Sequence, residues 1–235
     1  MIKRGLALLV LLCMALPCAG MAEQTEARRV VYLTFDDGPK KDTPELLETL
    51  SELDVPATFF LVGLSVRAFP EYAKQIVQAG YAVGSHTMAH SIGRIQKDAE
   101  FVLRDLARFE KTMREEVDET FSTDLFRFPG GSTNTVSHRY GGSDIMKKLK
   151  ADAESRGFTY VDWNVCAEDS LGGHPSASTI YNNIIREVGD KNTCVVLMHD
   201  TNATKNTAAA LPDVIRWFKN AGYRFDTVDH LEKKP

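Results

Sequence analysis

Short apolar runs alternate with longer amphipathic stretches along almost the whole chain from residue 30 onward. The apolar runs are rich in Val, Phe, Leu and Tyr and are bounded by Gly, Pro, Asn or Asp, which is typical of buried strands. The expected strands are Val30–Phe35, Ala57–Val62, Ala82–Ser85, Leu125–Phe128, Phe158–Trp163, Cys194–Met198 and Arg224–Val228. Strands that alternate with helical patterns predict a parallel sheet covered by helices.

The amphipathic stretches have recognisable helix ends. Thr43 is a suitable N-cap, and Pro44 follows it at the first helical position. A second helix is expected to begin at Pro70 and to end at Gly80, where glycine can take the left-handed conformation that closes a helix. A long helix is expected from about Gln96 to Val117, with its apolar residues on one stripe.

The number of expected strands constrains the fold class. Seven strands are too few for the standard eight-stranded barrel, so we expect an α/β fold with a distorted, incomplete (β/α) barrel of about seven parallel strands. No Pro- or Ser-rich linker interrupts the pattern, which predicts a single domain. In such sheets the functional groups gather at the carboxyl ends of the strands.

The first residues have the layout of a secretory signal peptide. Lys3 and Arg4 precede an apolar stretch, Leu6–Leu16, and small residues end at Ala22. We therefore expect a signal peptide over residues 1–22 and a single domain over residues 23–235, in a protein that is exported (secreted, periplasmic or cell-envelope). An uncleaved anchor is the alternative, and it would be the chain's only contact with a membrane.

The composition is that of an ordinary globular protein, with 43% hydrophobic residues, 26% charged residues and a net charge of −4. This weakly acidic balance gives no support to nucleic-acid binding. After the expected signal peptide, the sequence contains two cysteines, Cys166 and Cys194. Their places on the expected strands put them at different heights in the sheet, so we expect two free thiols.

Charged and polar residues follow five of the expected strands at the point where each strand ends. Because the carboxyl ends of parallel strands meet at one edge, these segments are expected to lie close together. The segments are Asp36-Asp37 in TFDDGP, His86–His90 in HTMAH, Arg127–Gly131 in RFPGG, Asp162–Asn164 in DWN, and Leu197–Asp200 in LMHD.

Three of these residues have the chemistry of a catalytic metal site. Neutral imidazole is the commonest zinc ligand, and catalytic sites use three protein ligands with one position open to water. His86 and His90 with Asp37 supply such a set, and Asp36 could then take a proton from the water. A plain polar turn and two unrelated surface histidines are the simpler interpretation, but it leaves their common position at one rim unexplained.

The five motifs, in this order and over Val31 to about Val228, resemble those of carbohydrate esterase family four, the polysaccharide deacetylases. The resemblance implies a distorted (β/α) barrel. It also implies that Asp36 is the general base, that Asp37, His86 and His90 bind a divalent ion, and that Arg127 pairs with Asp36. The ion in this family is usually zinc, sometimes cobalt or another divalent cation.

The resemblance assigns further roles on the other side of the site. His199 would be the general acid, kept charged and oriented by Asp162. Leu197 and Trp163 would line a pocket for the acetyl methyl group. Gly130 stands where many relatives have Tyr; its backbone N–H would still stabilise the oxyanion, but the groove would be more open.

The function implied is hydrolysis of N-acetyl groups on an amino-sugar polymer, with peptidoglycan as the first expected substrate in the cell envelope or outside the cell. Removal of O-acetyl groups from acetylated xylan and deacetylation of chitin-like oligomers are the alternatives. A non-catalytic glycan-binding protein is a further alternative, which the presence of both Asp36 and His199 argues against. We expect a monomer.

Overall fold

The computed structural model describes residues 29–95, 99–172, 174–201 and 205–231. The expected signal peptide, residues 1–22, lies outside the described residues. Within the described ranges, none of the helices is both long enough and apolar enough to cross a membrane.

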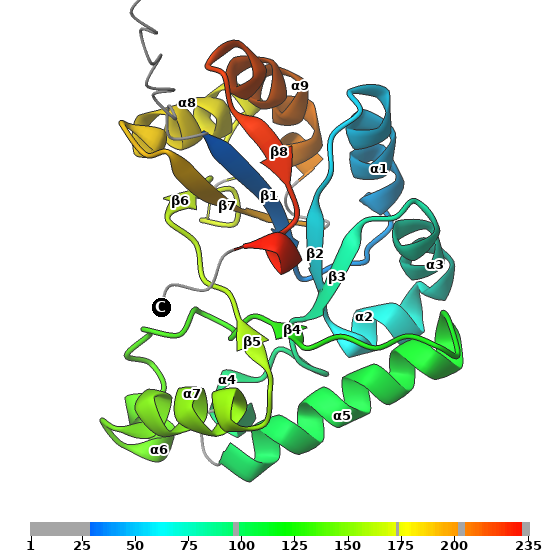
Figure 1. The fold of residues 1–235 in the computed structure, drawn as a ribbon, viewed down its shortest axis with the longest axis vertical. Helices are drawn as coiled ribbons and strands as arrows, with labels where there is room; N and C mark the ends of the chain where they lie inside the picture. Colours follow the sequence, from blue (N-terminus) through cyan, green and yellow to red (C-terminus); the bar gives the residue numbers. More distant parts are fainter. Residues whose placement is uncertain (1–28, 96–98, 173, 202–204, 232–235) are drawn as a thin grey trace, which may run out of the picture.

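The strands form one parallel sheet with the order β5-β4-β3-β2-β1-β7-β6, and β8 pairs with the start of β1 beside this path (Figure 1). The path does not join β5 to β6, so the curled sheet stays open on that side, and the expected distorted, incomplete barrel is confirmed. The strands are β1 (Val30–Asp36), β2 (Thr58–Leu61), β3 (Ala82–Ser85), β4 (Leu125–Phe126), β5 (Thr159–Tyr160), β6 (Val165–Cys166), β7 (Thr193–His199) and β8 (Arg224–Asp226).

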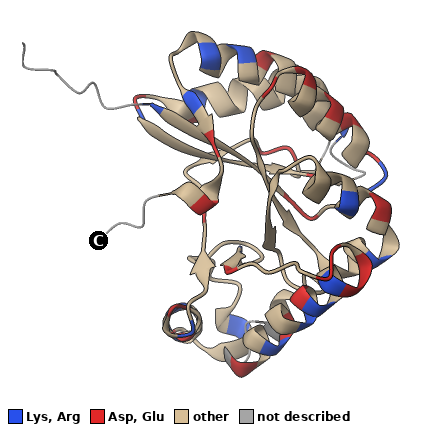
Figure 2. Cartoon of the chain, turned by 45° about the vertical axis from the view of Figure 1, so that its right-hand side comes forward, with Lys and Arg blue, Asp and Glu red and all other residues tan. Residues whose placement is uncertain are grey.

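The helices lie around the outside of the sheet (Figure 1). They are α1 (Thr43–Glu52), α2 (Gly63–Ala68), α3 (Pro70–Gln78), α4 (Ile92–Ile95), α5 (Ala99–Glu116), α6 (His138–Gly141), α7 (Ile145–Ser155), α8 (Ala177–Val188) and α9 (Lys205–Asn220), with a short 3₁₀ helix at Val228–His230. Figure 2 shows acidic and basic residues interspersed along these outer helices.

Two local expectations need correction. The N-cap of α1 is Asp42, whereas Thr43 lies inside the helix with its hydroxyl directed at Asp200. The segment Asp162–Asn164 does not end a strand beside β7, because β5 is shorter than expected and pairs only with β4, whereas the additional strand β6 pairs with β7. Only two residues long, β6 carries too little periodicity to be recognised in the sequence.

The central strand β1 is buried along its whole length, as expected for a parallel sheet covered on both faces. Side chains alternate between the faces of a strand. Leu33 and Phe35 therefore pack under the outer helices, while Tyr32 joins the cluster inside the barrel. Asp36 shares the inner face with Tyr32, so its carboxylate points into the barrel mouth.

The strand register brings the expected functional segments to one rim. Asp36 lies opposite Phe60 of β2 and His199 of β7. On the other side of β2, Ser85 of β3 lies level with Phe126 of β4. The residues that follow these positions, including those of HTMAH and RFPGG, are therefore neighbours. Cys166 and Cys194 are both free thiols, as expected.

Candidate active site

The two neighbouring aspartates at the end of β1 face different surroundings. Asp36 is the last residue of the strand, and its side chain is only 4% exposed. Asp37 leaves the strand with a left-handed backbone (φ 76°), and its side chain is 25% exposed. The two carboxylates nevertheless approach the same ring, because Asp36 Oδ2 and Asp37 Oδ1 each lie 3.6 Å from His86 Nε2.

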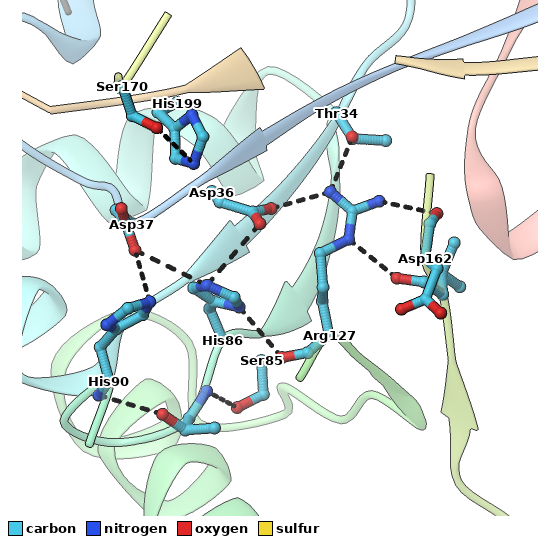
Figure 3. A network of polar contacts seen from close by, with 12 residues as sticks. Thr34, Asp36, Asp37, Ser85, His86, His90, Arg127, Asp162, Ser170 and His199 are labelled. Atoms are coloured by element: carbon cyan, nitrogen blue, oxygen red, sulfur yellow. Dashed lines mark hydrogen bonds and ion pairs between the residues drawn. The ribbon is translucent and has the colours of Figure 1, made fainter. Parts of the chain in front are cut away.

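Arg127 holds the carboxylate of Asp36 from inside the barrel. Its side chain is fully buried, and its Nη1 donates to Asp36 Oδ1 at 2.9 Å and to Thr34 Oγ1 at 2.8 Å. The rest of the guanidinium donates to the carbonyl oxygens of Val161 and Asp162. A buried charge is tolerated only when it is paired and hydrogen-bonded in this way. The expected Arg127–Asp36 pair is confirmed (Figure 3).

Asp37, His86 and His90 form a possible metal site. Their ligand atoms all lie within 4.8 Å of one another, and Asp37 Oδ1 is 3.6 Å from His86 Nε2 and 3.5 Å from His90 Nε2 (Figure 3). Ligand atoms about 2.0–2.1 Å from a tetrahedral zinc ion lie about 3.4 Å apart. The donor types and their spacing therefore fit a divalent ion.

The ring of His86 is oriented by a backbone group. Its Nδ1 lies 3.0 Å from the carbonyl oxygen of Arg127. A carbonyl can only accept, so Nδ1 carries the proton and Nε2 has its lone pair available for the candidate ion. Burial lowers the pKa of His86 and outweighs the opposite effect of Asp36 and Asp37. The neutral imidazole is the form that binds metals.

The loop that carries both histidines is strained and firmly held. Thr87 and His90 have positive φ angles of 72° and 49°, which is unusual for residues other than glycine. The Thr87 N–H donates to Ser85 Oγ at 3.0 Å, and the His90 N–H donates to Thr87 Oγ1 at 3.1 Å. Met88 N–H donates to the buried carboxylate of Asp105 at 2.6 Å. Such supported strain is common at functional sites.

His199 is oriented by Asp169, which the sequence analysis did not identify. His199 Nδ1 is 2.7 Å from Asp169 Oδ1, and the His199 N–H donates to Oδ2 at 2.9 Å. Thr207 of α9 donates its hydroxyl to the same Oδ2 at 2.7 Å. The Asp169 side chain is fully buried. Its only signal in the sequence is an acidic residue inside a long aperiodic loop.

The expected pair of Asp162 and His199 is therefore wrong. The carboxylate of Asp162 accepts from the backbone N–H and the hydroxyl of Ser132, at 2.9 Å and 2.5 Å. Figure 3 shows Asp162 beside Arg127, with His199 on the other side of Asp36. Asp162 supports the Arg127 side of the site because it follows β5, which pairs with β4, whereas β7 lies beyond β1 in the sheet.

The surroundings of His199 favour its charged form. Burial lowers the pKa of this imidazole, but the hydrogen bond and negative charge of Asp169, together with the charges of Asp36 and Asp37, outweigh burial and raise it. Its Nε2 lies 3.5 Å from Ser170 Oγ. A protonated His199 can donate the Nε2 proton while Asp169 holds the opposite side of the ring.

The remaining predicted residues lie at the same rim. Gly130 has a φ of 77°, is exposed, and its N–H meets no hydrogen-bond acceptor in the described part of the chain. Leu197 is buried on β7, on the same face as His199. Trp163 is half-buried, and its ring packs against Gly131. Their shared role around an acetyl group stays a prediction.

Comparison with known proteins agrees with this fold and site. Residues 23–160 match the family model "Polysaccharide deacetylase". A peptidoglycan-N-acetylglucosamine deacetylase from Bacillus cereus is 32% identical over 204 residues, covering 85% of this chain and 69% of the relative. The chain belongs to the polysaccharide deacetylase family, and it is a polysaccharide deacetylase enzyme.

Two solved structures show the same architecture. The catalytic domain of peptidoglycan N-acetylglucosamine deacetylase from Eubacterium rectale is 31% identical with a TM-score of 0.80, covering 87% of this chain and 90% of that one. A polysaccharide deacetylase from Bacillus cereus is 32% identical with a TM-score of 0.75, covering 88% of this chain and 96% of that one. The fold similarity thus extends beyond the region that the family model matches.

Proposed function

We propose that this enzyme hydrolyses the N-acetyl groups of N-acetylglucosamine residues in peptidoglycan, outside the cell or at the cell envelope. The observation that supports the mechanism is that a candidate base, Asp36, and a candidate acid, His199, lie at the same rim of the barrel. A carboxylate held by Arg127 lies 3.6 Å from the Nε2 atom of His86, while Asp169 favours a protonated His199. Amide hydrolysis needs such a base and such an acid together.

Asp37, His86 and His90 would hold the divalent ion, with zinc as the first candidate and cobalt as the second. Such an ion supplies Lewis-acid chemistry, which activates water and polarises a carbonyl group. The neutral, oriented imidazole of His86 and the accessible carboxylate of Asp37 are suited to this role. Because Asp37 Oδ1 is the carboxylate oxygen near both imidazoles, Asp36 would remain available for proton transfer.

Asp36 would take the proton from the attacking water. Arg127 holds the base at this point, because its Nη1 donates to Asp36 Oδ1, and the same Nη1 is itself oriented by Thr34 Oγ1, to which it also donates. The N–H of Gly130 would donate to the oxyanion that develops on the acetyl group, and one such donor is typically worth about 3 kcal/mol.

His199 would then protonate the sugar nitrogen, because an amine is a far better leaving group than an amide anion. The proton comes from Nε2, and the negative charge of Asp169 stabilises the imidazolium until the transfer occurs. Proton transfers of this kind usually contribute about 10²–10⁴-fold to the rate.

The choice of peptidoglycan rests on two of the relatives named above, which are peptidoglycan N-acetylglucosamine deacetylases. The predicted signal peptide supports a location where that polymer is available. This part of the proposal is independent of the catalytic roles and can fail without them.

A direct test compares substrates. The full chain, loaded with Zn²⁺, is incubated with purified peptidoglycan, N-acetylglucosamine oligomers and acetylated xylan, and the acetate released and the new free amines are measured. We expect acetate and amines from peptidoglycan at the highest rate. Activity confined to xylan would replace the proposal by O-deacetylation, and activity confined to the oligomers would replace peptidoglycan by a chitin-like substrate.

The matched control for this test is Asp36→Asn, which keeps the size of the side chain and removes the base. We expect a loss of about 10²–10⁴-fold in kcat with Zn²⁺ affinity nearly unchanged, because Asp36 is not among the proposed ligands. A loss of metal measured by calorimetry would contradict the separate roles of Asp36 and Asp37.

A further inference from the structure

Asp200, the residue after His199, is a buried carboxylate that the proposed reaction does not use. Only 2% of its surface is exposed, and within the described residues its carboxylate accepts one hydrogen bond, from Thr43 Oγ1 at 2.6 Å. Burial raises the pKa of Asp200 to about 7, although Thr43 and Lys40 oppose the shift. A carboxylate with so few donors is costly to bury, which suggests a role other than stability.

Asp200 lies against the turn that presents both site aspartates. Its N–H donates to the carbonyl oxygen of Asp36 at 2.8 Å. Its carboxylate presses on the backbone of Gly38, where a Cβ atom would overlap Asp200 Oδ2. The turn passes so close to the carboxylate that only glycine fits at this position.

Thr43 connects the far side of the same turn to Asp200. Its hydroxyl donates to Asp200 and accepts from the N–H of Lys40 at 2.7 Å, so both hydrogen-bonding functions of the hydroxyl are in use. Thr43 is fully buried, and its own N–H donates to the carbonyl oxygen of Lys40 at 3.1 Å. The turn of residues 36–40 is therefore held at its beginning by Asp200 and at its end by Thr43.

We propose that Asp200 and Thr43 are positioning residues that keep Asp37 directed at His86 and His90. Asp37 needs such support because its left-handed backbone is unfavourable for an aspartate. If the turn relaxed, the carboxylate of Asp37 would move away from both imidazoles. The inference rests on the proposed function only for the roles of the two site aspartates.

The test compares variants of Thr43 that lack or retain the side-chain hydroxyl. Thr43→Val keeps the shape of the side chain and deletes the bridge to Asp200, whereas Thr43→Ser restores the hydroxyl. The matched control is Thr58→Val, because Thr58 is equally buried, but its hydroxyl accepts the Val228 N–H at 3.2 Å and does not contact the turn that carries Asp37. Zn²⁺ affinity by calorimetry, kcat, KM and Tm are measured on the full chain.

We expect Thr43→Val to weaken Zn²⁺ binding about tenfold and to lower kcat by a similar factor with KM little changed, as residues that orient metal ligands generally do. Thr43→Ser should recover most of the affinity. Thr58→Val should lower Tm by a comparable amount and leave Zn²⁺ affinity unchanged. Wild-type Zn²⁺ affinity in Thr43→Val, or an equal loss in Thr58→Val, would overturn the proposal.

Asp200→Ala removes the other partner of the same contact, and by itself it should weaken Zn²⁺ binding about tenfold, which tests the proposal even if Thr43→Val does not fold. Where both single variants fold, the double variant should lose no more Zn²⁺ affinity than either of them. Additive losses would overturn the shared role. If the wild type releases no acetate from any glycan while these affinity changes occur, the proposed function fails and the positioning role stands.

Discussion

The two histidines on either side of Asp36, His86 and His199, have pKa values shifted in opposite directions. His86 and His199 both follow or end a strand of the same sheet, and both are largely buried beside carboxylates. The pKa of His86 is lowered, whereas that of His199 is raised. The hydrogen-bond partner of Nδ1 differs between the two rings. It is the backbone carbonyl oxygen of Arg127 for His86 and a carboxylate oxygen of the buried Asp169 for His199.

The difference shows how one residue type acquires two functions. A carbonyl oxygen fixes the tautomer without adding a full charge, so burial dominates and the imidazole stays neutral. A carboxylate fixes the same tautomer and also stabilises the imidazolium. The first arrangement suits the proposed metal ligand and the second suits the proposed proton donor.

Removal of His86 should have the largest effect. His86→Ala deletes one of three proposed ligands, and we expect loss of bound metal together with a fall in kcat of about 10³-fold or more, because the ion is expected to supply several kcal/mol of the catalysis. Elemental analysis measures the metal directly. Full occupancy in the variant would show that Asp37 and His90 do not need this ring.

Replacement of Asp169 tests the proposed role of His199 as the proton donor. Asp169→Asn removes the charge that raises the pKa of His199, so the imidazole should lose its proton at lower pH, and the alkaline limb of the kcat profile should move to lower pH. We expect kcat to fall about 10²–10³-fold, which is within the usual contribution of a general acid. Metal content should stay unchanged.

Asp162→Asn is the matched control for Asp169→Asn. The carboxylate of Asp162 binds Ser132 and not His199, so the alkaline limb should keep its position. A shift of the limb in this variant, with none in Asp169→Asn, would reverse the assignment that the structure makes.

A smaller effect is expected from Thr207. Its hydroxyl donates to Asp169 Oδ2 at 2.7 Å, and Thr207→Val leaves the buried carboxylate with one donor fewer. We expect kcat to fall by roughly tenfold or less, the effect of one hydrogen bond of up to about 1.5 kcal/mol. Thr207→Ser should retain wild-type kcat. Equal losses in both variants would point to packing and not to the hydroxyl.

Much of this fold was predictable because strands and helices leave patterns in short stretches of sequence. Each expected strand is present, since buried parallel strands are continuous apolar runs that any window of the sequence reveals. The approach of Asp37 to His86 and His90 was predictable as well, because the carboxyl ends of neighbouring parallel strands share one edge. The Arg127–Asp36 pair was predicted from the family resemblance.

The tertiary structure decided the partners that no local pattern encodes. Asp169 reaches His199 from an aperiodic loop, and strand β6 is too short to be recognised, so the sequence favoured Asp162 instead. Thr43 has the sequence features of a helix cap, yet its hydroxyl binds Asp200, far along the chain. Helix and strand patterns arise from neighbouring residues, whereas the partner of a buried polar group depends on which distant segments packing brings within about 3 Å.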